Sequence, residues 1–180
     1  MKKNFLFFSV VIILLNSCTP AIHVFSDYDR DAKIDDYKTY HWLELSSIEQ
    51  KGTNPLYSNE LNDKRIKSAV NKEMKAKGFQ VVAGKAELEL HYHIIVEDKK
   101  SMVTEPFGYN YGTYWERQKV SVFQYQEGTL IIDLMDTKNN SLVWRGWATG
   151  AITDQSLKKP EEAIQYAVNR IFKSFPYSSL

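Results

Sequence analysis

The stretch Ala86-Glu87-Leu88-Glu89-Leu90-His91-Tyr92-His93-Ile94-Ile95-Val96 decides the fold of this chain. Apolar and polar side chains alternate along it, which is the period of two that a strand shows when one face meets a core and the other meets solvent. The side chains expected on the core are Ala86, Leu88, Leu90, Tyr92, Ile94 and Val96. Such a strand predicts an antiparallel sheet that is covered on one face only.

Two amphipathic helices flank this strand in the sequence. A helical period runs from about Ser58 to Lys77, and Gly78 follows it as a residue that ends helices in the left-handed conformation. A second helical period runs from Glu161 to Phe175, after Pro160, which suits a first helical turn. We therefore expect an α+β fold, in which a mainly antiparallel sheet carries both amphipathic helices on one face.

The remaining strands are expected on either side of these elements. They share a high content of aromatic and β-branched residues and cover 22–28, 37–43, 79–82, 115–126, 128–136 and 142–152. Residues 98–112 are punctuated by proline and glycine, so we expect a long connection there. The segment from Thr137 to Ser141 predicts a hairpin turn, because asparagine tolerates a positive φ.

The N-terminus has the pattern of an export signal. Lys2 and Lys3 precede an apolar run from Phe5 to Leu15, which is too short to span a bilayer as a lone helix. Leu15-Asn16-Ser17-Cys18 then resembles the lipobox of bacterial lipoproteins, in which the cysteine is lipidated and becomes the first mature residue. We predict that residues 1–17 are removed, that 18–21 form a lipidated tether and that 22–180 form one domain.

The expected localisation follows from the residues around Cys18. An aspartate at the second mature position retains many lipoproteins in the inner membrane, and Thr19 stands there instead. Resemblance to these sorting rules favours a lipid anchor in the outer membrane, with the domain facing the periplasm. The alternatives are an ordinary secretory signal or an uncleaved anchor with Cys18 as an incidental thiol.

Composition excludes some classes of function. Without Lys2 and Lys3, the 23 basic side chains of the chain fall to 21, against 22 acidic ones. No basic patch is apparent, so a nucleic acid is not an expected partner. Cys18 is the single cysteine, which excludes an intrachain disulfide. The sequence contains no catalytic motif, and we predict neither an enzyme nor a cofactor.

Several phrases together resemble an uncharacterised family of bacterial lipoproteins, domain of unknown function 4136. They are Tyr37-Lys38-Thr39-Tyr40-His41-Trp42, Lys77-Gly78-Phe79, the strand from Glu127 to Asp136, and Leu142-Val143-Trp144-Arg145-Gly146-Trp147-Ala148. The resemblance covers nearly the whole mature chain. It implies a lipid-anchored envelope protein of α+β type and supplies no catalytic residues.

Two polar groups are candidate sites. His91 and His93 lie two apart on one strand, so both rings project from one face and could bind a metal if a neighbouring strand adds a ligand; otherwise they are polar residues on the wet face of the sheet. Asp133 and Arg145 flank the predicted hairpin, and a register that pairs them would form a cross-strand ion pair of structural use.

The aromatic segment from Tyr109 to Trp115 is the third candidate. Tyr109, Tyr111, Tyr114 and Trp115 lie in the predicted loop with Gly112 among them, and such loops often hold binding residues; the alternative is that the aromatic rings fold back onto a satellite core. Our leading hypothesis is a non-enzymatic module that binds an envelope protein or a cell-wall glycan through this loop. The rival hypothesis is a metal-binding or hydrolytic protein that uses the His91 and His93 face.

Overall fold

The computed structural model describes residues 21–43, 54, 56–107 and 117–176. Six strands form one sheet in the order β1-β6-β5-β4-β2-β3. Their bounds are β1 Ile22–Tyr28, β2 Thr39–Trp42, β3 Gln80–Val81, β4 Leu88–Phe107, β5 Arg117–Asp136 and β6 Ser141–Ala151. The three helices are α1 Glu60–Ala76, α2 Asp154–Lys158 and α3 Pro160–Phe172, and a short 3-10 turn spans Ile34–Asp36.

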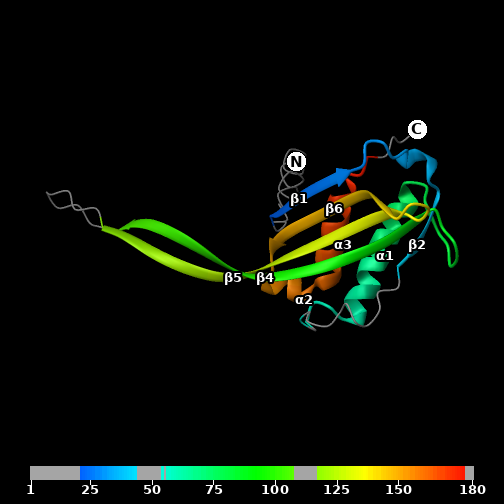
Figure 1. The fold of residues 1–180 in the computed structure, drawn as a ribbon. Helices are drawn as coiled ribbons and strands as arrows, with labels where there is room; N and C mark the ends of the chain where they lie inside the picture. The colour runs from blue at the N-terminus through cyan, green and yellow to red at the C-terminus, as the bar shows by residue number, and fades with distance from the viewer. Residues whose placement is uncertain (1–20, 44–53, 55, 108–116, 177–180) are drawn as a thin grey trace, which may run out of the picture.

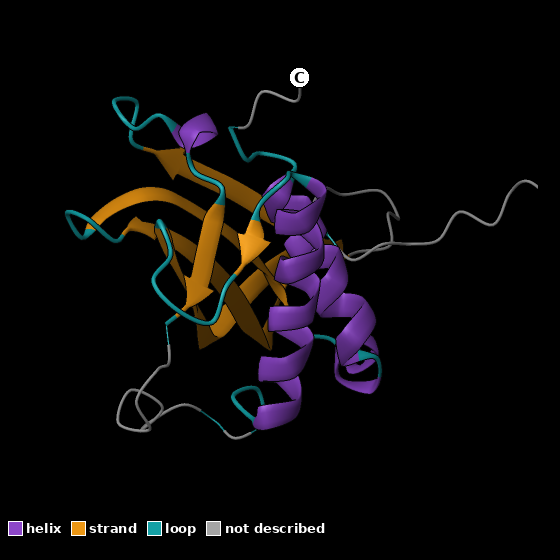
Figure 2. Cartoon of the chain, turned by 90° about the vertical axis from the view of Figure 1, so that its right-hand side faces the viewer, coloured by secondary structure: helices purple, strands orange, loops and turns teal. Residues whose placement is uncertain are grey.

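The expected α+β class is confirmed. β1, β6, β5 and β4 pair antiparallel, whereas β2 pairs parallel with both β4 and β3, so the sheet is mixed and mostly antiparallel. Figure 2 shows α1 and α3 together on one side of the sheet. The short helix α2 was not expected, and a capping box between Thr153 and Ser156 begins it.

The core lies between the sheet and the two long helices. Leu88 and Leu90 of β4 are at most 1% exposed, as the alternation predicts. Trp144 of β6 is fully buried and its ring contacts those of Phe172 and Phe175, with centroids 5.4 and 4.9 Å apart. In the described part of the chain, the residues of this core and those packed against it all lie between Ile22 and Phe175.

Two residues with positive φ end elements where the sequence requires it. Gly78 has a φ of 87° directly after α1, and the Phe79 amide reaches back to the carbonyl of Met74. Asn140 has a φ of 55° in the turn between β5 and β6, as its side chain permits. The expected stop of α1 and the expected hairpin are therefore both present.

The prediction of a connection over residues 98–112 is wrong for most of that segment. β4 continues to Phe107 and pairs with β5, which runs unbroken from Arg117 through the two segments expected as separate strands. Ten register pairs, from Asp98 with Gln126 to Phe107 with Arg117, lie beyond the last pair between β5 and β6. Figure 1 shows this part of β4 and β5 as an arm that projects from the domain. We call residues 98–107 and 117–126 the arm.

Candidate functional site

The arm is a two-stranded ribbon whose described side chains are largely exposed, with a group of apolar ones beyond its root. Side chains alternate between its faces, so Met102 and Val122 share one face while Val103 and Phe123 share the other. Met102 is 72% exposed, Val122 53% and Phe123 56%. No element of the described chain packs on either face, so the arm presents apolar surface that folding does not bury.

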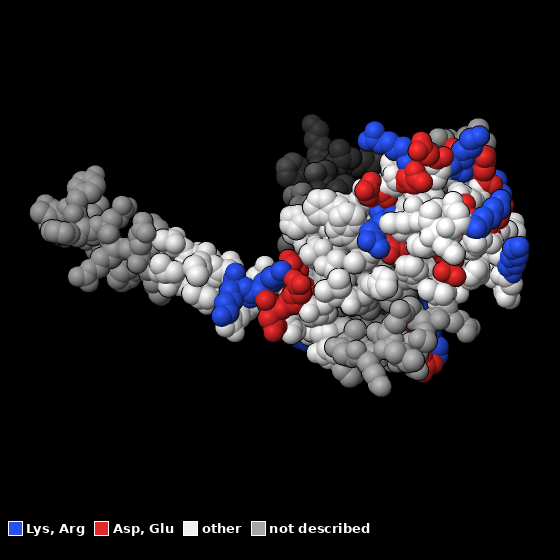
Figure 3. Space-filling view, in the orientation of Figure 1, with Lys and Arg blue, Asp and Glu red and all other residues white. Residues whose placement is uncertain are grey.

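Charges gather at the root of the arm. Lys99 lies 2.6 Å from a carboxylate oxygen of Glu97 and 3.7 Å from one of Glu127. Figure 3 shows acidic and basic side chains at this root, and a surface without either on the described part of the arm beyond it. The Tyr57 hydroxyl donates to Gln126 Oε1 at 2.6 Å and fixes the loop before α1 against the root. The arm therefore leaves the domain at a well-defined point.

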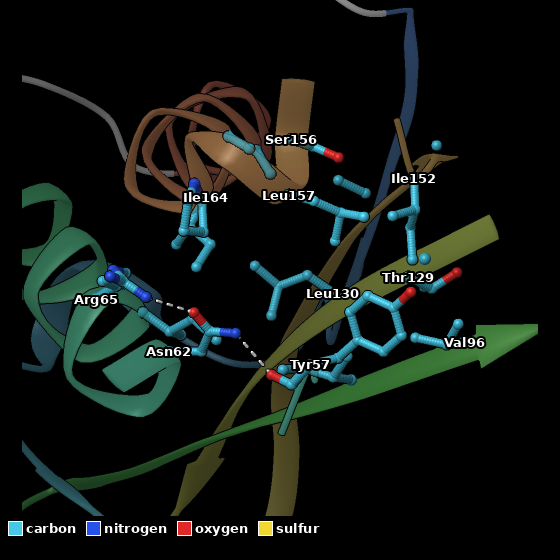
Figure 4. Close-up of a pocket in the computed structure, with 18 of the residues that line it drawn as sticks. Tyr57, Asn62, Arg65, Val96, Thr129, Leu130, Ile152, Ser156, Leu157 and Ile164 are labelled. Atoms are coloured by element: carbon cyan, nitrogen blue, oxygen red, sulfur yellow. Dashed lines mark hydrogen bonds between the residues drawn. The ribbon is translucent and has the colours of Figure 1, made fainter. Parts of the chain in front are cut away.

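A second feature is an apolar pocket of about 520 Å³ at the same end of the domain. Its walls come from the core face of β4, β5 and β6, from the start of α1, and from α2 and α3. Figure 4 shows Leu130 in the middle of this pocket, with Leu157 and Ile164 opposite it. The volume lies within the range of small-molecule sites.

The face of the sheet opposite α1 and α3 holds a polar cluster. Register places His91, Asp133 and Arg145 in one row across β4, β5 and β6. Arg145 Nε and Nη2 each donate to a different oxygen of Asp133 at 2.6 Å, and His91 Nε2 lies 3.1 Å from Oδ2. Burial raises the pKa of Asp133, but the hydrogen bonds from Arg145 and His91 outweigh it and hold this pKa at about 2.

The same cluster contains the two histidines considered as metal ligands. The His93 Nε2 lies 4.0 Å from Asp133 Oδ2, and the candidate ligand atoms of His91, His93 and Asp133 all lie within 4.8 Å of one another. The neighbouring strand β5 therefore supplies Asp133 as a third ligand beside the two histidines. However, Arg145 occupies both oxygens of that carboxylate, so a cation would compete with the guanidinium.

The structure brings together the predicted residues His91, His93, Asp133 and Arg145 and leaves other predicted residues outside its description. Asp133 and Arg145 meet in the register that the hairpin suggested, and the fully buried Asp133 joins them to His91. Cys18 and the aromatic segment with Tyr109, Tyr111, Tyr114 and Trp115 lie outside the described residues.

The sequence predicted the β5 strand of the arm, within 115–126, but neither the β4 strand of the arm nor the pocket was expected. A signal for the arm does exist, because Val120, Val122 and Phe123 form a run of high strand propensity opposite Met102 and Val103. The pocket has no comparable signal, because its depth depends on which small residues of distant segments lie side by side. No helix of the described chain is long and apolar enough to cross a bilayer.

Fold and sequence place this chain in one class of uncharacterised α+β domains. The family model of the domain of unknown function DUF4136 matches residues 24–177. The chain belongs to this family, and the resemblance noted in its sequence is confirmed. No curated protein matches the chain.

Three solved structures are similar to it. A PDZ domain protein from Parabacteroides distasonis superposes with a TM-score of 0.54 at 14% identity, over 90% of this chain and 38% of that one, so this chain spans well under half of its length. A DUF4136 family protein from Bacteroides thetaiotaomicron gives a TM-score of 0.47 at 19% identity, over 87% and 96% of the chains. A PelC dodecamer from Paraburkholderia phytofirmans gives a TM-score of 0.47 at 13% identity, over 88% and 100%.

Proposed function

We propose that this protein is a lipid-anchored, non-enzymatic interaction module of the cell envelope, whose arm docks on a partner protein. The observation that carries the proposal is the arm itself. A two-stranded ribbon is at best marginally stable alone in water, and this one exposes Met102, Val122 and Phe123 instead of burying them. Exposed contiguous apolar surface of this kind marks a binding surface.

The open edges of the arm favour a protein over a bilayer or a glycan. β2 pairs with β4 only as far as Leu90, and β6 ends at Ala151 opposite Glu127, so both outer edges of the arm present unpaired backbone groups in the described chain. Open edges do not enter hydrocarbon, because each unsatisfied backbone group costs several kcal/mol there. A partner that adds a strand pairs these groups and covers the apolar side chains together.

The first strand, β1, begins at the same end of the domain as the arm. Ile22, the first residue of β1, pairs with Gly150, which pairs with Gly128 at the root of the arm. Cys18 stands four residues before Ile22, a distance that an extended chain covers within about 14 Å. A lipid on Cys18 therefore holds the root of the arm close to the membrane, and the residue after Cys18 favours the periplasmic face of the outer membrane.

Site-specific photocrosslinking in intact cells tests the arm. A photoreactive residue at Val122 is expected to yield a discrete crosslinked protein, whereas the same residue at Lys158, exposed on α2, is the matched control. Met102→Glu added to the Val122 probe should abolish the product by placing a charge on the same face of the arm, directly opposite Val122. Crosslinks to glycan alone, no product at Val122, or equal products at both positions would overturn the proposal.

Fractionation with lipid labelling tests the anchor separately. The natural chain should incorporate labelled palmitate and sediment with outer membranes. Cys18→Ser should lose the label and move to the soluble periplasmic fraction. An unlabelled protein that stays in the membrane after this substitution would contradict a lipid anchor on Cys18.

Metal binding is a second candidate function with one observation in its favour. His91, His93 and Asp133 bring two imidazoles and one carboxylate within a few ångströms. The bidentate grip of Arg145 argues for a structural use of the same groups, because it satisfies both carboxylate oxygens without a cation. The competition between Arg145 and a metal is directly testable.

A further inference from the structure

Two glycines lie side by side among the residues that line the apolar pocket between the sheet and the helices. Gly128 of β5 pairs with Gly150 of β6, and the next row holds Ala148 opposite Leu130. A Cβ at Gly128 would lie 3.3 Å from two side-chain carbons of Ile152, and one at Gly150 would lie 2.9 Å from Ile22 Cγ2. The two glycines therefore let Ile22 and Ile152, which also line the pocket, lie close against the strands.

One end of the pocket carries a cation without a carboxylate partner. Arg65 of α1 lines the pocket, and its Nη1 donates to Asn62 Oδ1 at 2.8 Å. Asn62 is itself held by a hydrogen bond of 2.9 Å from its Nδ2 to the Tyr57 carbonyl. Among the described residues, no carboxylate lies within 4 Å of the Arg65 guanidinium. Figure 4 shows Arg65 and Tyr57 on opposite sides of Leu130.

This combination of features selects a class of ligand. The long apolar lining fits a hydrocarbon chain, and a guanidinium with free donors fits a carboxylate, which it can bind through two hydrogen bonds. Ile22 also lines the pocket, four residues after Cys18, so the proposed lipid anchor holds the pocket beside a membrane. We propose that this pocket binds a long-chain fatty acid taken from the membrane, with the chain along Leu130 and the carboxylate at Arg65.

The choice of a membrane lipid as the source rests on the anchor proposed above, whereas the pocket does not depend on the arm. The two proposals therefore fail separately. A binding assay on a chain without lipid tests the pocket alone, and loss of crosslinking at Val122 says nothing about it.

Calorimetric titration of tetradecanoate into the mature chain, residues 18–180 with Cys18→Ser, tests the proposal. This chain contains the whole described core. Saturable binding with one site is expected, and dodecanoate should bind roughly tenfold more weakly because it buries two fewer methylenes. The methyl ester of tetradecanoate should also bind about tenfold more weakly, and Arg65→Gln should remove this preference for the carboxylate.

Matched glycine variants test the location. Gly128→Val should weaken tetradecanoate binding at least about tenfold, because the new side chain would push Ile152 into the pocket. Gly84→Val is the control, because a Cβ at Gly84 meets nothing within 4 Å. Circular dichroism establishes that each variant is folded, and Arg65→Gln keeps the test informative if Gly128→Val is not.

Four results would overturn the proposal. They are absence of saturable binding, equal affinity for both chain lengths, tighter binding of a lysophospholipid with the same chain, and a lipidated natural protein that no longer binds. The third would assign the pocket to a phosphate head group. The fourth would assign it to the protein's own acyl chain.

Discussion

Arg145 holds Asp133 through both carboxylate oxygens, across the pair of strands that a single turn connects. The Asp133 side chain is 1% exposed, whereas that of Arg145 is 44% exposed. The charge that is expensive to bury is thus fully paired, and its partner keeps contact with water. This arrangement makes the pair a contributor to stability whose size depends on pH.

Acid should weaken the fold through Asp133. Its pKa is about 2 in the folded chain against an ordinary 3.8, so the folded state favours the ionised form. The resulting contribution of about 2 kcal/mol is complete above about pH 5 and is lost as the pH falls from about 4 to about 2. Urea unfolding across this range should show the loss in the natural chain. Asp133→Asn should lower stability by about 2–4 kcal/mol near pH 7 and reduce the acid dependence.

The exposed Asp31 offers a control, since its side chain has no ion pair within the described chain. Asp31→Asn should leave both stability and its acid dependence close to those of the natural chain. An acid dependence that survives in full in Asp133→Asn would show that another carboxylate carries it.

Zinc binding should depend on whether Arg145 is present. The natural chain is expected to bind Zn²⁺ weakly, because the guanidinium already occupies both oxygens of Asp133. Arg145→Met frees the carboxylate beside His91 and His93, and the affinity should rise at least about tenfold, since the metal then compensates a buried charge. Calorimetry measures both chains. Tight binding by the natural chain that His91→Ala abolishes would favour the metal-binding candidate instead.

Gly146→Ala should destabilise the core. A Cβ there would lie 2.5 Å from a ring carbon of Trp144 and 2.6 Å from Ile171 Cγ2, and both of these side chains are fully buried. The indole cannot move without opening the core, so a loss of about 1–3 kcal/mol is expected in thermal or urea unfolding. Gly84→Ala, which meets open space, should change stability by less than about 0.5 kcal/mol. Equal effects of the two substitutions would contradict this account.

Gly78 should be replaceable at a cost that depends on the new residue. Its φ of 87° follows α1, where a residue with a Cβ is strained. Gly78→Ala is expected to cost about 1 kcal/mol, and Gly78→Asn less, because asparagine adopts this conformation more readily. Unfolding by urea compares the two variants, and an alanine variant as stable as the asparagine variant would refute the explanation.

Much of the fold could be predicted because the apolar residues of its strands and helices recur with the spacing that packing on one shared core requires. Leu88 and Leu90 alternate with polar residues as a half-covered strand requires, and Ile66 and Val70 follow the helical period of α1. The β4 strand of the arm, residues 98–107, escaped prediction because its side chains pack on no core of the described residues. Lys99, Lys100 and Pro106 indicated a loop, but the ladder to β5 continues past them. The parallel pairing of β2 with β4 has no local signal, since it joins segments about fifty residues apart.

The candidate sites also differ in how far they could be predicted from the sequence. Asp133 and Arg145 are separated by a short turn, so their register followed from local sequence. The further contact of Asp133 with His91 depends on how β4 pairs with β5. The sequence alone does not specify the register of that pairing. The pocket is still harder to predict from the sequence, because its lining residues Arg65, Gly128 and Gly150 come from three different elements.

The row from Ile22 through Gly150 to Gly128 places the start of the domain beside the root of the arm. With a lipid on Cys18, the arm is confined to a layer of space next to the membrane. The depth of this layer is about the length of the tether plus the length of the arm, which is about 33 Å for ten residues. A partner resident in the same membrane is then met by lateral diffusion in two dimensions, at an effective concentration that the short tether sets. Even weak pairing along the arm would suffice to hold such a partner.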